Sequence, residues 1–318
     1  MKKLVVLISI LSVLVSCKNE EIKKVDVSGI QVTVLIDRFE QKFYAANEQT
    51  LPVLENEYPY LFPPQNDSIW LNKINDAEEI ELFQKSQVVF TDFNTEKTEI
   101  ESLFKHIKYY HSSFRSPKII TLITNLDYQN KVMYADSLLF VSLDMYLGKK
   151  SEVYQDFPMY LVQNFDKSHL VVDIAKAIGE TYFIPTKNRQ FIDVMINEGK
   201  KMYLLDSYLP LVSDAKKIGY SVVKYQWTVS NEAQTWKYFV ENKLLYSTDS
   251  KLYKRFIADA PFSKFYIDID KESPGKIGVW LGWQIVRSYM NNNNVTLQQL
   301  LQENAEEIFK KSKYKPKK

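Results

Sequence analysis

The chain has 318 residues, of which 45% are hydrophobic and 25% charged, and its formal net charge is +2. This composition is typical of a globular protein that is long enough for one large domain or two small ones. Acids and bases are interspersed without a basic stripe, which argues against nucleic-acid binding, and only 8 glycines favour a helix-rich fold over a many-stranded barrel.

The N-terminus carries the pattern of an export signal. Two lysines precede an apolar run over residues 4–15, which is too short to span a bilayer comfortably. The sequence LVSC at residues 14–17 then matches a bacterial lipobox. It predicts a signal peptide over residues 1–16, cleavage between Ser16 and Cys17, and acylation of Cys17, the only cysteine of the chain. The alternative is a plain signal peptide with a buried cysteine.

A tether and then a strand are predicted to follow. Residues 17–27 are mostly charged and aperiodic, which predicts a tether, and residues 28–318 are predicted to form a single globular domain. Apolar residues at alternate positions over 30–36 predict a half-buried strand. Residues 38–46 are predicted to form an amphipathic turn or helix.

Several short helices are predicted between residues 50 and 110. Asp76 is the predicted N-cap of one of them, and the helix over 95–110 presents a single apolar stripe. Large and β-branched apolar residues predict strands over 118–126 and 137–145. A short strand over 131–134 would complete a small sheet with the first strand.

The centre of the chain, residues 169–210, is predicted to form two consecutive, closely packed helices. Ser168 is the predicted N-cap of the first helix and Pro185 separates the two. A glycine inside a helix costs about 1 kcal/mol relative to alanine. Gly179 and Gly199 therefore indicate close approach between helices.

The last third of the chain is aromatic and helical. Ser230 and Thr248 are predicted to cap two helices, and an apolar helix is predicted over 276–290. Thr296 and Gln299 form a capping-box pattern at the start of one final helix. Taken together, these patterns predict an α+β, predominantly α-helical fold with a small N-terminal to central β-sheet.

The central helices carry the candidate chemical site. His169 and Asp173 are spaced i, i+4, and Glu198 lies on the second helix, so the three could form a mixed nitrogen and oxygen metal site. The favoured interpretation is instead that His169 is a first-turn surface residue and that the two carboxylates bond to backbone or to basic side chains. His106 and His111 diverge around a helix and are predicted to be surface or interface residues.

Five blocks carry a family resemblance, and they occur in order over nearly the whole chain. They are the lipobox at Cys17, IDRFEQKFY at 36–44, LDMYLG at 143–148, INEGKKMY at 196–203 and SPGKIGVWLGWQIVRSYM at 273–290. With these blocks the chain resembles the gliding motility lipoprotein GldB family of Bacteroidota. The resemblance implies a membrane-anchored part of the gliding apparatus, a machinery linked with type IX protein secretion.

The same layout is similar to a wider group of zincin-like predicted metallopeptidases. In that group the first core helix carries HExxH and the second carries an EG motif. Here the HExxH window falls at residues 172–177, VDIAKA, which contain no histidine, whereas Glu198-Gly199 keeps the EG pair. The resemblance therefore implies a zincin-like domain with vestigial site residues His169, Asp173 and Glu198, no catalytic residues, no metal and no cofactor.

The functional expectation is a non-catalytic interaction or scaffold protein that is required for gliding motility. Its expected partners are a membrane, through the lipid anchor, and other gliding or secretion proteins. It is expected in the cell envelope outside the cytoplasm, at an inner or an outer membrane. One alternative is a metal-dependent peptidase with an unconventional site. Another is a peptide-binding or chaperone module that holds an extended peptide by strand addition in a cleft between the strand near residues 140–143 and the first core helix.

Overall fold

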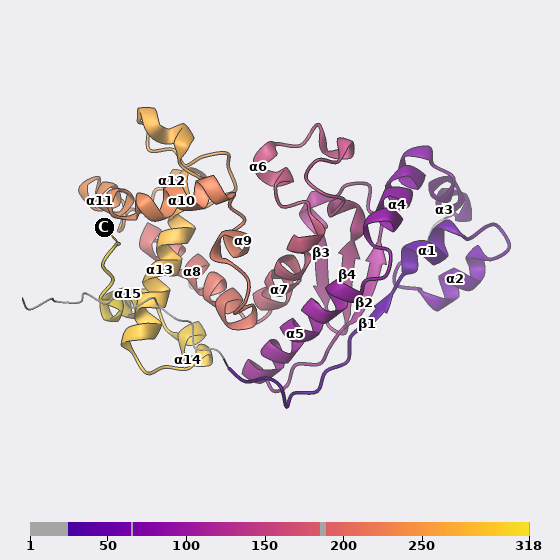
Figure 1. The fold of residues 1–318 in the computed structure, drawn as a ribbon, viewed down its shortest axis with the longest axis horizontal. Helices are drawn as coiled ribbons and strands as arrows, with labels where there is room; N and C mark the ends of the chain where they lie inside the picture. The colour runs from indigo at the N-terminus through magenta and orange to yellow at the C-terminus, as the bar shows by residue number, and fades with distance from the viewer. Residues whose placement is uncertain (1–24, 65, 185–188, 318) are drawn as a thin grey trace, which may run out of the picture.

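The computed structural model describes residues 25–64, 66–184 and 189–317, and it contains a small mixed sheet (Figure 1). The strand order is β1-β2-β4-β3, with β1 parallel to β2, β2 parallel to β4, and β3 antiparallel to β4. Both sides of β4 are therefore paired, so a peptide cannot add at residues 140–143, and the free edges of the sheet are β1 and β3. The strands are β1 (Leu35–Asp37), β2 (Lys118–Leu122), β3 (Val132–Ala135) and β4 (Leu138–Ser142).

Helices cover both faces of this sheet. Successive residues of a strand point to opposite faces, so neighbouring residues pack into different cores. Ile120 joins a small apolar core with α1 to α3, whereas Ile119 joins the main core, which extends from Val34 to Ile308. Figure 1 shows α1 to α3 together at one end of the molecule. The helices of this half are α1 (Phe39–Tyr44), α2 (Leu51–Glu57), α3 (Asp67–Ile74), α4 (Ala77–Val89) and α5 (Asn94–Tyr110).

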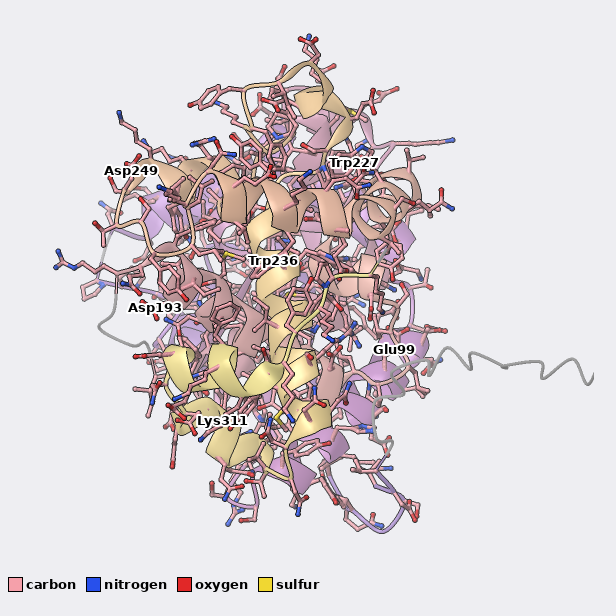
Figure 2. The ribbon with its side chains drawn as sticks, turned by 90° about the vertical axis from the view of Figure 1, so that its left-hand side faces the viewer. Glu99, Asp193, Trp227, Trp236, Asp249 and Lys311 are labelled. Carbon is pink, nitrogen blue, oxygen red and sulfur yellow. The ribbon has the colours of Figure 1, made fainter. Side chains whose placement is uncertain are left out.

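The second half of the molecule is helical and is built around α8 and α13. Trp236 of α11, labelled in Figure 2, packs against Phe309 of α15 and against Tyr314, which joins α11 to the C-terminal segment. The helices of this half are α6 (Met159–Val162), α7 (Leu170–Glu180), α8 (Phe191–Tyr208), α9 (Asp214–Ile218), α10 (Val222–Ser230), α11 (Glu232–Glu241), α12 (Lys251–Phe256), α13 (Ile277–Asn292), α14 (Leu297–Gln302) and α15 (Ala305–Ser312).

The close helix contact occurs between α8 and α13 rather than between the two consecutive helices α7 and α8. A Cβ atom added at Gly199 would lie 2.3 Å from the carbonyl oxygen of Gly282, and one added at Gly282 would lie 1.8 Å from that of Met195. An added Cβ at Gly179 would meet only side-chain carbons, at 3.6 and 3.8 Å. The prediction of close approach is therefore confirmed for Gly199, with α13 as the partner, and is wrong for Gly179.

The α+β, predominantly helical fold class is confirmed, as are several local predictions. Asp76 caps α4, and Thr296 and Gln299 form the capping box of α14. Other boundaries were predicted wrongly. The strand expected over 30–36 is regular only from Leu35, and the single last helix is two helices, because Asn304 caps a new one.

The predicted caps of two other helices are also wrong. Ser230 is the last residue of α10, and the helix that it was predicted to cap, α11, begins after Asn231, whose side chain makes no capping hydrogen bond. The helix expected after Thr248 begins only at Lys251, where the Asp249 carboxylate accepts the Lys251 backbone N–H at 2.9 Å.

Candidate functional site

Helix α7 begins differently from the prediction. The Asp166 side chain accepts the backbone N–H of Ser168 at 3.0 Å and starts a 3-10 turn, η4 (Lys167–His169), which leads directly into α7. Ser168 is therefore capped rather than capping. The turn continues the helical path, so that His169 and Asp173 face the same side of the chain.

Asp173 lies at the centre of a buried polar cluster. Its Oδ2 accepts a hydrogen bond from the Lys131 ammonium at 2.5 Å and another from the Tyr146 hydroxyl at 3.0 Å. Burial on its own would raise the pKa of this carboxyl, but the nearby positive charges, chiefly that of Lys131, together with the Lys131 hydrogen bond outweigh it and hold the pKa of Asp173 well below its usual value. The carboxylate is thus ionised, and its charge is neutralised by Lys131, the residue that precedes β3.

His169 is buried, with only 4% of its surface exposed, so the interpretation as a first-turn surface residue is wrong. Its Nε2 lies 3.8 Å from Asp173 Oδ1, beyond hydrogen-bond distance. Burial lowers the pKa of His169 to about 3, although the Asp173 charge acts in the opposite direction. The imidazole is neutral at physiological pH because water is excluded from it.

Glu198 does not join this cluster. Its carboxylate lies 3.3 Å from the Lys201 ammonium, which also contacts Glu180 of α7 at 3.0 Å. The Glu198 side chain is 28% exposed, so it bonds at the surface of a cavity rather than within the core. Across residues 25–64, 66–184 and 189–317, no three His, Cys, Asp or Glu side chains are grouped so that they could hold a metal ion.

A cavity of about 340 Å³ adjoins the cluster between α7, α8, α12 and α13. Lys176 of α7 lines this cavity. Desolvation, together with the nearby charges of Lys276 and Lys131, lowers the pKa of Lys176 to about 8, although the charge of Asp173 acts in the opposite direction. On the opposite wall the Lys276 ammonium binds Asp259 at 2.7 Å and the carbonyl of Ile218 at 3.2 Å. Charges of both signs therefore line this cavity.

A second cavity, of about 550 Å³, continues from the first and shares Asp259 and Lys276 with it. It lies between α6, the start of α10 and the segment that leads into α13. We call the two cavities together the basic cleft. Its lining lysines are Lys176, Lys201, Lys217 and Lys276 in the first cavity and Lys149, Lys150, Lys224 and Lys276 in the second.

Sequence reasoning found Asp173 but missed the residues that surround it. Lys176 follows Asp173 by three positions on the same helix, so helical periodicity could have placed it beside that carboxylate. Lys131, Asp259 and Lys276 come from distant segments, and no local pattern connects them with α7. The predicted cleavage and acylation residues, Ser16 and Cys17, and the helix break at Pro185 lie outside the described residues.

His106 and His111 are also buried, contrary to the prediction. The Nδ1 of His106 lies 2.8 Å from the carbonyl oxygen of Ser102, one turn earlier in α5. The Nε2 of His111 lies 2.6 Å from the Tyr208 hydroxyl, and its ring stacks on Tyr182 with centroids 3.6 Å apart. These contacts explain why two polar rings are accommodated in the core.

The comparisons with known proteins identify a family. No curated protein and no solved structure matches the chain significantly. Within the part of the chain that the structure describes, no helix has both the length and the apolar character that a membrane crossing requires. The family model of the gliding motility protein GldB matches residues 20–316. Because this match covers nearly all of the chain, the chain belongs to the GldB family of gliding motility lipoproteins.

Proposed function

We propose that this gliding motility lipoprotein is a non-catalytic binding component of the gliding and secretion apparatus. Its frame would descend from a zincin-like peptidase, with α7 and α8 in the places of the two helices that carry metal ligands. The packing of α7 against β3 supports that layout. The proposal assigns the protein a role in holding partners at the cell envelope rather than in cleaving them.

The observation that carries this proposal is the ion pair between Lys131 and Asp173. A catalytic metal needs carboxylate or imidazole lone pairs that converge on one point. Here Oδ2 of Asp173 is bound by an ammonium at 2.5 Å, and the His169 Nε2 lies 3.8 Å from Oδ1. Glu198 is bound to Lys201, which leaves the three candidate ligands in two separate ion-pair clusters.

Metal analysis of the full-length, detergent-solubilised lipoprotein tests this proposal. We expect well under one equivalent of zinc per chain, and no change in metal content for Asp173→Asn or Glu198→Gln.

A peptidase would give a different pattern. It would hold stoichiometric zinc, lose that zinc in both variants, and cleave a peptide library in a chelator-sensitive way. Loss of gliding in Glu198→Gln cells at normal protein abundance, together with such zinc binding, would overturn the proposal.

A further inference from the structure

We propose that the basic cleft is the docking site for an acidic segment of a protein partner. This inference rests on the proposed binding function and names the chemistry of the partner. It is carried by three observations: the charge that remains after the ion pairs of the cleft are counted, the apolar side chains beside that charge, and the position of the cleft relative to the membrane tether.

Among the described residues, three carboxylates line the cleft, and two lining lysines bind them, so one negative charge is left unmatched. Asp259 is bound by Lys276 at 2.7 Å, and Glu180 and Glu198 share Lys201 at 3.0 and 3.3 Å. Lys217 is neutralised by the buried Asp206 at 2.9 Å. These pairs leave the remaining lysines of the cleft in excess.

Four further lysines that line the cleft do not neutralise any of these carboxylates, and they give the cleft its net positive charge. Lys149 and Lys150 are exposed at its wall, and within the described part of the chain neither has a carboxylate within ion-pair distance. Lys224 donates to the carbonyls of Lys271, Glu272 and Ser273 at 2.8 to 3.0 Å, which carry no formal charge. Lys176 lies 3.9 Å from Asp173, whose charge Lys131 already balances.

Apolar groups stand beside these lysines. Met159 of α6 is 77% exposed, and it lines the second cavity together with Tyr160, Tyr220, Pro261 and Pro274. Volumes of about 340 and 550 Å³ fall in the range of sites that enclose many-atom ligands rather than a single ion. Mixed basic and apolar walls fit a peptide in which acidic and apolar residues are interspersed.

The second cavity of the cleft lies away from Val25. Val25, the first described residue, lines a different cavity together with residues of the connection from α13 to α14. In Figure 1, α14 lies at the bottom, whereas α6 and α10, which line the second cavity, lie at the top. From Cys17 to Val25 the chain can extend at most roughly 28 Å. An anchor at Cys17 would therefore attach on the side of the molecule away from the second cavity, which favours a protein partner over the headgroups of its own bilayer.

The test measures binding of a fluorescent decapeptide of alternating acidic and apolar residues to the full-length protein in detergent, by anisotropy. Its reference is the same peptide with Asn and Gln in place of Asp and Glu. We expect the acidic peptide to bind at least tenfold more tightly, and its affinity to fall as salt is added.

Charge reversal in the protein completes the design. The double variant Lys149→Glu/Lys150→Glu should weaken binding at least tenfold and abolish gliding in cells. The matched control is Lys310→Glu/Lys311→Glu, an adjacent exposed pair on α15, which does not line the cleft (Figure 2). The control should bind within twofold of the unmodified protein and should glide.

Equal affinity for the two peptides, or equal loss of binding in both double variants, would overturn the docking site. So would binding of anionic-lipid vesicles, but not of the peptide, through Lys149 and Lys150. None of these outcomes bears on the metal content or on peptide cleavage, so a failure here remains separate from a failure of the non-catalytic function.

Discussion

At the scale of single residues, the ion pair of Lys131 and Asp173 contributes to the stability of the fold. Their side chains are only 19% and 10% exposed, so removing one partner leaves a charge that water reaches poorly. We expect Lys131→Met to lower the free energy of unfolding by about 3 kcal/mol. Urea denaturation measures this change, and the double variant Lys131→Met/Asp173→Asn should recover part of it.

Lys201→Met serves as the control for that variant. Lys201 contacts Glu180 and Glu198, whose side chains are 55% and 28% exposed, so both carboxylates keep much of their hydration. We expect Lys201→Met to lower the free energy of unfolding by about 1 kcal/mol or less. If Lys131→Met proves no more costly than Lys201→Met, Asp173 does not depend on its lysine.

The buried histidines make stability depend on pH. In the unfolded chain the His111 imidazole has its ordinary pKa of 6.5, whereas burial lowers the pKa in the folded protein to about 4. The unfolded state therefore binds a proton first, and the free energy of unfolding falls as the pH drops from about 6.5 towards 4, by roughly 3 kcal/mol for this group.

His169 acts in the same direction, because burial lowers its pKa as well. Denaturation curves between pH 7 and 4 measure the combined effect. The variant His111→Gln lacks the titrating ring, so its stability should change less over this range. An identical pH dependence in the variant would show that His111 is not the group responsible.

At the scale of elements, the crossing of α8 and α13 depends on the absence of side chains. A Cβ at Gly282 would stand 1.8 Å from a carbonyl oxygen of the facing helix, so the helices must separate to admit it. We expect Gly282→Ala to lower the melting temperature and to cost about 2 kcal/mol or more in unfolding free energy.

Gly179→Ala is the matched control, because the added methyl meets side-chain carbons at 3.6 Å or farther. The substitution gains the helix propensity of alanine and should leave stability unchanged or raise it by up to about 1 kcal/mol. A stabilised Gly282→Ala protein would contradict the close crossing.

Elements with a strong local signal were predictable, and their partners were not. The apolar stripe of α5 and the cap of α4 are local patterns, and both are present as expected. The contact of Gly199 with Gly282 joins segments 83 positions apart, and no periodicity indicates it. The charged cluster was missed for the same reason, since Lys131 and Asp173 lie on segments that only the fold brings together.

At the scale of the whole molecule, the fold class and the family were predictable from composition and from ordered sequence blocks. Which residues of the cleft face one another depends on packing between distant segments, so among the residues that line it the sequence indicated only Glu198 as a site residue. The histidines of α5 and α7 were misjudged because polarity predicts exposure, whereas contacts such as that of His111 with Tyr208 offset the cost of burial.

The family also makes membrane attachment a testable property of the whole chain. We expect Cys17→Ser to move the protein from the membrane to the soluble fraction without changing its melting temperature, because residue 17 precedes the described fold. Cell fractionation checks this outcome. A variant that remains in the membrane fraction would show that the attachment does not depend on acylation.

The order of strands in the sheet has a consequence for export. Leu35 of β1 pairs with Lys118 of β2, so the first strand has no neighbour until more than eighty further residues have been translocated. A chain that crosses a membrane with its N-terminus leading would expose this unpaired strand throughout that interval. The small core of α1 to α3 takes all of its buried residues except Ile120 from the segment between Phe39 and Ile74, so most of it can form during that interval, before β2 arrives.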